Sequence, residues 1–140
     1  MHRSLGFGLI ELMIVVASVA ALAAIALPAY QIYAVRSQVA EGFSVASGAR
    51  DAVVTYYGER GSFPPSNGDA GMPPPDTYSS RYLSSVSVTA AGQIEIPFAP
   101  SAHALIAGQT LVLEAHPAGG SISWTCSGLD SRLLPAPCRP

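Results

Sequence analysis

The sequence contains no lysine, and its seven arginines are set against nine carboxylates. Only 11% of the residues are charged, and the arginines are scattered along the chain. Nucleic-acid-binding proteins usually carry a basic patch or stripe. The charge pattern therefore argues against nucleic-acid binding as the main function.

Residue patterns of enzymes are also lacking. The three histidines, His2, His103 and His116, stand far apart in the sequence. There is no glycine-rich phosphate loop and no nucleophile-elbow motif around any of the serines. We therefore expect no catalytic site, no metal site and no cofactor.

A long apolar run near the N-terminus dominates what is present. Between Leu12 and Ala29 no side chain is ionisable, and Glu11 carries the one charge of residues 7–33. About 20 apolar residues are needed to cross a bilayer as a helix. A short, weakly basic leader of residues 1–6 precedes the run.

Two ordinary interpretations fit this run poorly. A secretory signal peptide has an apolar region of about 7–15 residues that ends in a small-residue cleavage site. A plain membrane anchor does not explain Glu11, because a carboxylate inside the bilayer costs about 2.5–3.5 kcal/mol and is usually paired. Cleavage after Gly6 would create an amine on Phe7, one helical turn from Glu11 of the same chain and equally able to reach Glu11 of a neighbouring helix.

At these residues the sequence resembles the type IV pilins. The family pattern is a short basic leader ending in glycine, then Phe, a small residue, Leu-Ile-Glu and an apolar helix. Residues 6–16, Gly-Phe-Gly-Leu-Ile-Glu-Leu-Met-Ile-Val-Val, match this pattern. The one departure is Gly8, where the family usually has Thr or Ser. Residues 27–30, Leu-Pro-Ala-Tyr, are similar to the family's Ile-Pro-Ala-Tyr segment.

The resemblance implies a processing and assembly route. A prepilin peptidase would cleave between Gly6 and Phe7 and N-methylate Phe7. Glu11 would then pair with the Phe7 amine of a neighbouring subunit during assembly. Loss of the leader removes Arg3 and leaves six arginines against nine carboxylates, a net side-chain charge of −3.

The resemblance also implies partners and locations. The precursor would lie in the inner membrane, contact the pilus assembly machinery there, and polymerise with further copies into a helical filament. The mature chain would form an extracellular pilus, or fimbrium, on the cell surface. Cell adhesion, twitching motility and DNA uptake are functions of the family. Whether this chain binds nucleic acid is left open.

Pro28 interrupts the apolar run. A proline inside a helix removes one backbone hydrogen bond and kinks the axis. The resemblance further implies that the helix unwinds in part around Pro28 in the filament. Many alanines surround this position, and small residues let membrane helices approach closely. A bundle of such helices is therefore favoured over a solitary anchor.

The following residues have the periodicity of an amphipathic helix. The apolar positions recur at steps of three and four: Ile32, Val35, Val39, Phe43, Ala46, Ala49, Val53 and Tyr57. We expect residues 7–57 to form one helix about 75 Å long. No compact head of this size covers such a length, so the N-terminal half must protrude.

A loop and a sheet are expected next. Proline and glycine punctuate residues 58–80 and favour a surface loop. Strand-like alternation follows in residues 82–90, 93–98, 110–116 and 122–126, with turns at residues 91–92 and 117–120. Short turns between adjacent runs predict an antiparallel sheet with one face on a core. Pro97 should lie at a strand end or sheet edge.

The two cysteines, Cys126 and Cys138, lie near the C-terminus. After a membrane-targeting start, an even pair indicates one disulfide formed in an oxidising compartment. The closed loop would stabilise the head by about 3 kcal/mol in the chain-entropy picture. This tail is similar to the disulfide loop that ends many type IVa pilins.

We thus expect an α+β subunit with four parts. These are a leader (1–6), a transmembrane and filament-core helix (7–33), the amphipathic half of that helix (34–57), and a globular head (58–140) with an antiparallel sheet of about four strands. The function predicted is a structural subunit of a type IV pilus, of the major type. The alternatives are a minor pilin, a type II secretion pseudopilin and a DNA-binding pilin subunit.

Overall fold

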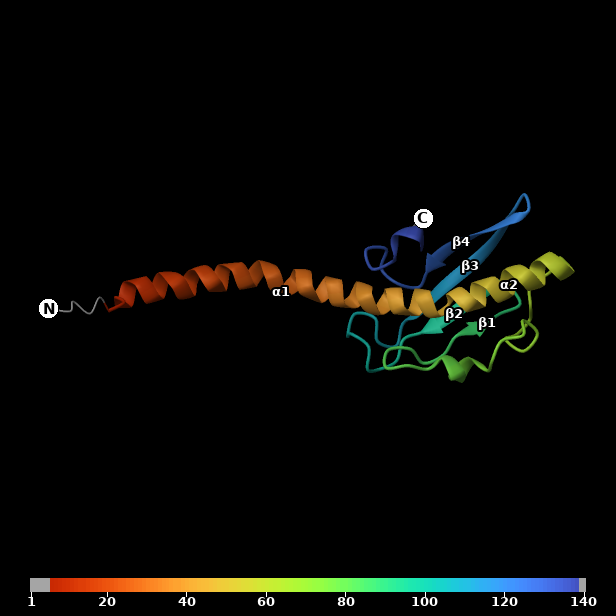
Figure 1. Ribbon diagram of the computed structural model, residues 1–140, viewed down its shortest axis with the longest axis horizontal. Helices are drawn as coiled ribbons and strands as arrows, with labels where there is room; N and C mark the ends of the chain where they lie inside the picture. Colours follow the sequence, from red (N-terminus) through yellow and green to blue (C-terminus); the bar gives the residue numbers. More distant parts are fainter. Residues whose placement is uncertain (1–5, 139–140) are drawn as a thin grey trace. The chain divides into compact units, whose positions relative to one another are not determined.

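The computed structural model describes residues 6–138 and has an α+β fold (Figure 1). Two helices come first, α1 (Leu9–Val45) and α2 (Ser47–Arg60). Four strands follow: β1 (Ser87–Val88), β2 (Gln93–Pro97), β3 (Thr110–Ala118) and β4 (Ser121–Ser127). Two 3-10 turns, η1 (Pro75–Tyr78) and η2 (Ala136–Cys138), flank the sheet in sequence.

The chain divides into two compact units. One ends at Tyr33 and the other begins at Ala34. The first unit contains the apolar part of α1. The second contains the rest of α1, all of α2, the sheet and the C-terminal tail, and we call it the head.

The predicted long N-terminal helix is confirmed, with different bounds. It begins at Leu9 and ends at Arg60, and a one-residue break at Ala46 separates α1 from α2. Helical hydrogen bonds are kept at the break, from the Ala46 N–H to the Gly42 carbonyl (3.0 Å) and from the Arg50 N–H to the Ala46 carbonyl (2.9 Å). Serine and glycine are poor helix formers, and Ser47 and Gly48 follow the break directly. The loop accordingly starts at Gly61 rather than at residue 58.

The sheet is antiparallel, with the strands in the order β1-β2-β3-β4. Pro97 is the last residue of β2, opposite Thr110, as predicted. The turn predicted at residues 117–120 is shorter than expected, because β3 continues to Ala118, which pairs with Ser121. Gly119 and Gly120 alone make the turn, with φ of 55° and 91°. Positive φ at both positions is what a two-residue type I′ hairpin requires.

The strand expected over residues 82–90 is much shorter than predicted. Only Ser87 and Val88 form β1, and Leu83 makes an isolated bridge to Phe98. Between these points the backbone pairs with the loop instead, since the Val86 N–H donates to the Pro75 carbonyl (3.1 Å). The proline-rich loop thus takes hydrogen bonds that a neighbouring strand would otherwise make.

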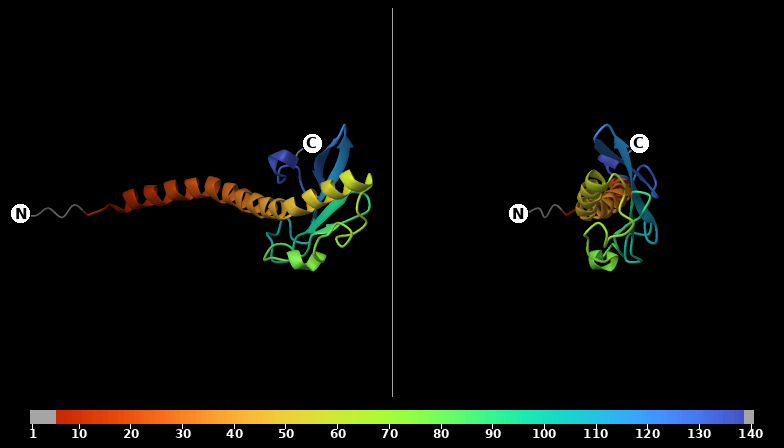
Figure 2. Two further views of the ribbon diagram at one scale, coloured as in Figure 1. Left: turned by 45° about the vertical axis from the view of Figure 1, so that its right-hand side comes forward. Right: turned by 90° about the vertical axis from the view of Figure 1, so that its right-hand side faces the viewer.

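The head core lies between the helices and one face of the sheet (Figure 2). Val35, Val39 and Val53 are fully buried on the helical side. The strands contribute Ile94, Ile96, Leu111 and Leu113, and Phe98 follows β2 directly. The predicted helix face and strand faces are therefore confirmed at these positions. Their packing makes the head a self-contained hydrophobic unit.

Gly42 sets how closely helix and sheet approach. A Cβ at this position would lie 3.3 Å from Leu83 Cδ2 and 3.5 Å from both Ile96 and Phe98. These distances leave almost no room for a side chain. The strand side chains therefore pack directly on the helix backbone at Gly42.

Candidate assembly segment

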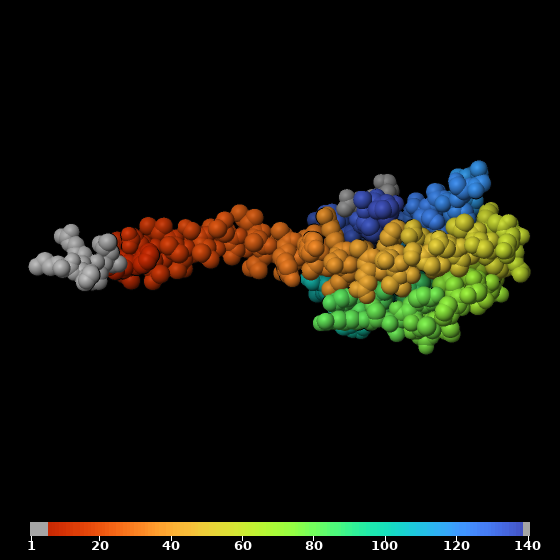
Figure 3. Space-filling view, in the orientation of Figure 1, coloured from red at the N-terminus to blue at the C-terminus, as the bar shows by residue number. Residues whose placement is uncertain are grey.

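Most side chains of residues 7–33 are apolar and exposed; Figure 3 draws this segment in red and orange. Phe7 is 88% exposed, Leu9 76% and Ile25 75%. Apart from the half-buried Ala23, every residue of this segment is exposed in the isolated chain. The helix is long and apolar enough to cross a membrane. Exposed apolar surface of this extent marks a segment that is covered by lipid or by other proteins.

Glu11 lies in the first turn of α1 and caps it. The backbone N–H of Gly8, the residue before the helix, donates to Glu11 Oε2 at 2.9 Å. This is the contact that a glutamate at the third helical position makes in a capping box. The carboxylate also lies at the positive end of the helix dipole, where an anion is stabilised. One oxygen of Glu11 is thus used locally, while Oε1 has no hydrogen-bond partner in residues 6–138.

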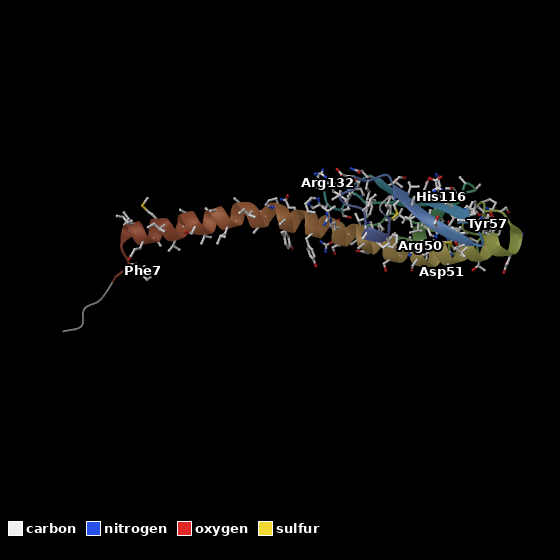
Figure 4. The ribbon with its side chains drawn as sticks, turned by 90° about the horizontal axis from the view of Figure 1, so that it is seen from above. Phe7, Arg50, Asp51, Tyr57, His116 and Arg132 are labelled. Atoms are coloured by element: carbon white, nitrogen blue, oxygen red, sulfur yellow. A yellow bond between two sulfur atoms is a disulfide. The ribbon has the colours of Figure 1, made fainter. Side chains whose placement is uncertain are left out.

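The predicted processing site lies just before the helix. Gly6 and Phe7 are exposed and precede α1 in non-helical backbone (Figure 4). The rest of the predicted leader, residues 1–5, lies outside the described part of the chain. The Gly6–Phe7 peptide bond therefore lies in exposed, non-helical backbone.

Pro28 lies inside α1 without ending it. Because proline has no N–H, the carbonyl of Ala24 lacks its helical donor. Among the small residues upstream, the Ser18 hydroxyl donates to the Ile14 carbonyl at 2.8 Å and so is satisfied within the helix. The helix thus carries its backbone defect at Pro28 and its one charge at Glu11.

The C-terminal tail of the head is closed by the Cys126–Cys138 disulfide, with the two Cα atoms 5.1 Å apart. The tail is also held to α1, because Arg36 Nε donates to the Arg132 carbonyl at 2.9 Å. Arg132 forms a two-pronged ion pair with Asp130 (2.8 and 3.1 Å). The hydrogen bonds from the side chain and backbone of Arg132 lower the pKa of Asp130 to about 2.

Sequence reasoning missed Asn67, the one buried polar residue in residues 6–138. Its Nδ2 donates to the carbonyls of Pro73 (3.1 Å) and Val86 (2.9 Å), and its Oδ1 accepts the Val88 N–H (2.7 Å). The side chain thus pairs with the outer edge of β1 as a neighbouring strand would. An asparagine in a loop rich in glycine and proline is so common that no sequence signal distinguished this one.

The histidines have separate local partners. The ring of His116 contacts the Thr125 hydroxyl at 2.8 Å across the β3–β4 pair. The ring of His103 accepts the Leu105 N–H at 3.2 Å. In residues 6–138 no group of three His, Cys, Asp or Glu side chains is placed to hold a metal ion.

An apolar helix exposed on all sides, joined to a disulfide-closed α+β head, defines a subunit that is incomplete until its helix is covered. The profile of the pilin family, described as pilin of bacterial filaments, matches residues 35–139. The chain belongs to this family of structural filament subunits, and the resemblance and the fold class predicted from the sequence are confirmed.

Several relatives match nearly the whole chain. A fimbrial protein, EcpC, of Eikenella corrodens is 45% identical over 96% of this chain and 90% of its own length. A type IV major pilin, PilE1, of Neisseria gonorrhoeae is 36% identical over 96% of this chain and 93% of its own. A fimbrial protein of Neisseria meningitidis serogroup B is 43% identical over 86% of this chain and 71% of its own. Each likeness covers both the apolar segment and the head.

Proposed function

We propose that this chain is the major subunit of a type IV pilus and reaches the filament as a processed membrane precursor. The observation that carries the proposal is the apolar segment of residues 7–33, exposed all round and bearing one carboxylate. The type IV major pilins of Neisseria gonorrhoeae among the relatives favour the major subunit over a minor pilin or a type II secretion pseudopilin. The role is mechanical and non-catalytic.

Proteolytic removal of the leader is the first step from membrane precursor to filament subunit. A prepilin peptidase of the inner membrane cleaves the exposed junction between Gly6 and Phe7 and methylates the new amine of Phe7. The amine keeps its positive charge. The apolar helix holds the precursor in the inner membrane until the assembly machinery extracts it, and the mature filament lies outside the cell.

The new amine and Glu11 then direct assembly. Two unit charges at about 4 Å interact by roughly 4 kcal/mol at an effective dielectric of 20. Such a pair offsets the cost of a carboxylate in the bilayer, about 2.5–3.5 kcal/mol. Oε2 of Glu11 is occupied by the Gly8 N–H, and the second oxygen is the acceptor for the Phe7 amine of a neighbouring subunit.

Pro28 adjusts the helix to its neighbours in the bundle. The Ala24 carbonyl lacks its helical donor, so the helix unwinds around Pro28 at a lower cost than elsewhere. Cell adhesion and twitching motility are the roles we propose for the filament. DNA binding receives no support from the arginines, since those of residues 36–132 lie on α1, α2, a loop and the tail.

The test is mass spectrometry of the N-terminus in filaments sheared from cells. We expect a chain that begins at Phe7 and carries one added methyl group. A chain that begins at Met1 in purified filaments contradicts the proposal. A Gly6→Leu variant is the control, since it blocks cleavage, leaves the sequence after Gly6 unchanged, and should accumulate in the membrane without entering filaments.

A further inference from the structure

The charges of the chain do not fix how deeply the apolar helix lies in a bilayer. Residues 12–35, between Glu11 and Arg36, contain no charged side chain. About 20 apolar residues are enough to cross a bilayer, so the uncharged stretch is longer than a crossing requires. The helix could therefore move along its axis by about one turn without drawing a charge into the hydrocarbon.

Two tyrosines end the apolar segment. Tyr30 is 69% exposed and Tyr33 is 72% exposed. They are three residues apart, so their side chains are neighbours on the surface of α1. Neither hydroxyl makes a hydrogen bond to another residue of the described range 6–138. Tyrosine joins an apolar ring to a polar tip, and it is enriched where a bilayer meets water. The pair therefore marks a position along the helix that favours the headgroup region.

The spacing of Tyr30 and Glu11 matches the thickness of a bilayer. Tyr30 follows Glu11 by 19 residues, which is about 29 Å of helix, and the hydrocarbon is about 30 Å thick. When the tyrosines lie at one surface, Glu11 reaches the other, where a carboxylate costs less than at the helix centre. A shift of one turn in either direction buries the carboxylate or the tyrosine hydroxyls. One depth of the helix thus suits both groups.

We propose that Tyr30 and Tyr33 bind the headgroup region of the bilayer and fix the depth of the helix in the membrane-bound precursor. Glu11 and the Gly6–Phe7 junction then lie at the opposite surface. The weakly basic leader places that surface on the cytoplasmic side. A protease held in the same membrane acts at a fixed depth, so the tyrosines position the junction for cleavage. This contact with lipid precedes any contact between subunits, and it rests on the proposed function because it needs the membrane precursor.

The first experiment measures the depth of each position. The chain has one tryptophan, Trp124 in the head, whose emission serves as the baseline. Tyr30→Trp and Tyr33→Trp, in the full chain, are inserted in phosphatidylcholine vesicles whose acyl chains carry bromine either just below the headgroup or near the bilayer centre. Because bromine quenches a tryptophan beside it, both variants should lose more emission to the bromine below the headgroup. Leu22→Trp is the matched control: Leu22 is also 69% exposed, but it lies inside the apolar segment and should lose more emission to the central bromine.

The possible failures of this experiment have different meanings. If the central bromine quenches both tyrosine positions as strongly as the shallow bromine, or more strongly, while Leu22→Trp behaves as expected, the anchor is wrong and the pilus function stands. If neither bromine quenches any of the three positions, the helix does not enter the bilayer. That result overturns the membrane precursor and the anchor together.

The second experiment removes the anchor. Tyr30→Leu/Tyr33→Leu extends the apolar surface and lets the helix move by up to about one turn. In cells that assemble the filament, we expect a loss of cleaved subunit at an unchanged total amount in the membrane, measured as the ratio of precursor to mature chain. Tyr30→Trp/Tyr33→Trp keeps interfacial rings and should be cleaved like the wild type. Wild-type cleavage of the leucine variant, or equal loss in both variants, overturns the positioning role. Failure of the wild-type chain to be cleaved would instead count against the proposed processing.

Discussion

The two units of the chain use apolar residues in opposite ways. In residues 7–33 nearly every apolar side chain is exposed, whereas every buried apolar residue of the described chain lies at Val35 or beyond. Both parts are helical where they meet, since α1 runs through the boundary. The same secondary structure therefore serves two different environments.

The difference follows from how the apolar residues are spaced. In the first unit they occur all round the helix, a pattern typical of a helix covered on every side by lipid or other helices. In the head they recur at steps of three and four and face one sheet. The head is thus stabilised by its own core, and the first unit by whatever surrounds it. Substitutions in residues 7–33 should therefore leave the stability of the head intact, and substitutions in the head should leave membrane insertion of residues 7–33 intact.

Replacement of Glu11 should give the largest effect and should affect only assembly. Glu11→Ala removes the charge at no cost to membrane insertion, since alanine is better tolerated there. We expect the variant to accumulate in the membrane and to form few or no filaments, at least about tenfold below wild type if one charge pair is lost. The measurement is filament yield by shearing and microscopy, together with the membrane level of the subunit.

A glutamine at position 11 separates the two roles of the side chain. Glu11→Gln can still accept the Gly8 N–H and so keep the helix cap, but it carries no charge. If charge pairing drives assembly, Glu11→Gln fails like Glu11→Ala. Normal filaments from the glutamine variant would mean that the cap alone matters.

Loss of the disulfide should affect the head and leave the apolar segment unchanged. We expect a fragment that begins at Ala34 to fold by itself, because it contains the whole core. Replacing both Cys126 and Cys138 by serine should lower its free energy of unfolding by about 3 kcal/mol, as the closure of a loop of this length predicts. Urea unfolding of the two fragments gives the difference. Membrane insertion of the full-length variant is the control, and impaired insertion would contradict the independence of the two units.

Much of this architecture could be predicted from the sequence because it depends on periodicity. The helix face of Val35, Val39 and Val53 and the alternation of Ile94 and Ile96 report burial directly, and the unbroken apolar run reports a helix without a polar face. The disulfide was predictable because the chain has two cysteines and a membrane-targeting start. These features are averages over several residues, so single irregularities do not hide them.

The features that could not be predicted depend on contacts between distant residues. No periodicity singles out Gly42, although the sheet needs its missing side chain for close packing. The shortness of β1 follows from a hydrogen bond to the loop, from the Val86 N–H to the Pro75 carbonyl, that no periodicity records. That Arg50 Nε is buried without a hydrogen-bond acceptor among residues 6–138 is likewise a property of the fold. Such positions become visible only when the neighbours are known.

Asn67 offers a smaller test of the head. Asn67→Ala would leave the Val88 N–H and the Val86 carbonyl without partners at the edge of β1. A buried polar group left unpaired costs about 1–3 kcal/mol, so we expect the head to lose about 2 kcal/mol of stability. Ser62→Ala, in the same loop, is the control, because the Ser62 side chain is exposed and makes no hydrogen bond among residues 6–138, so its loss should change stability by less than about 0.5 kcal/mol. Equal stabilities of the two variants would show that the loop does not support the sheet edge.

The smallest expected effect is the pH dependence of the Asp130–Arg132 pair. The hydrogen bonds from Arg132 lower the pKa of Asp130 from 3.8 to about 2 in the folded head. The stabilisation is therefore fully present above pH 3.8 and is lost as the pH falls toward 2. Its size is small, because the Arg132 side chain is largely exposed, that of Asp130 is 44% exposed, and surface ion pairs contribute little. Asp130→Asn keeps an oxygen for the Arg132 N–H but has no charge, so it should lower the melting temperature of the head slightly at pH 6 and not at all near pH 2.

Asp51→Asn, which removes an exposed carboxylate without an ion pair in residues 6–138, is the matched control for thermal unfolding. A difference between Asp130→Asn and wild type that stays constant from pH 6 to pH 2 would show that the ion pair does not stabilise the tail.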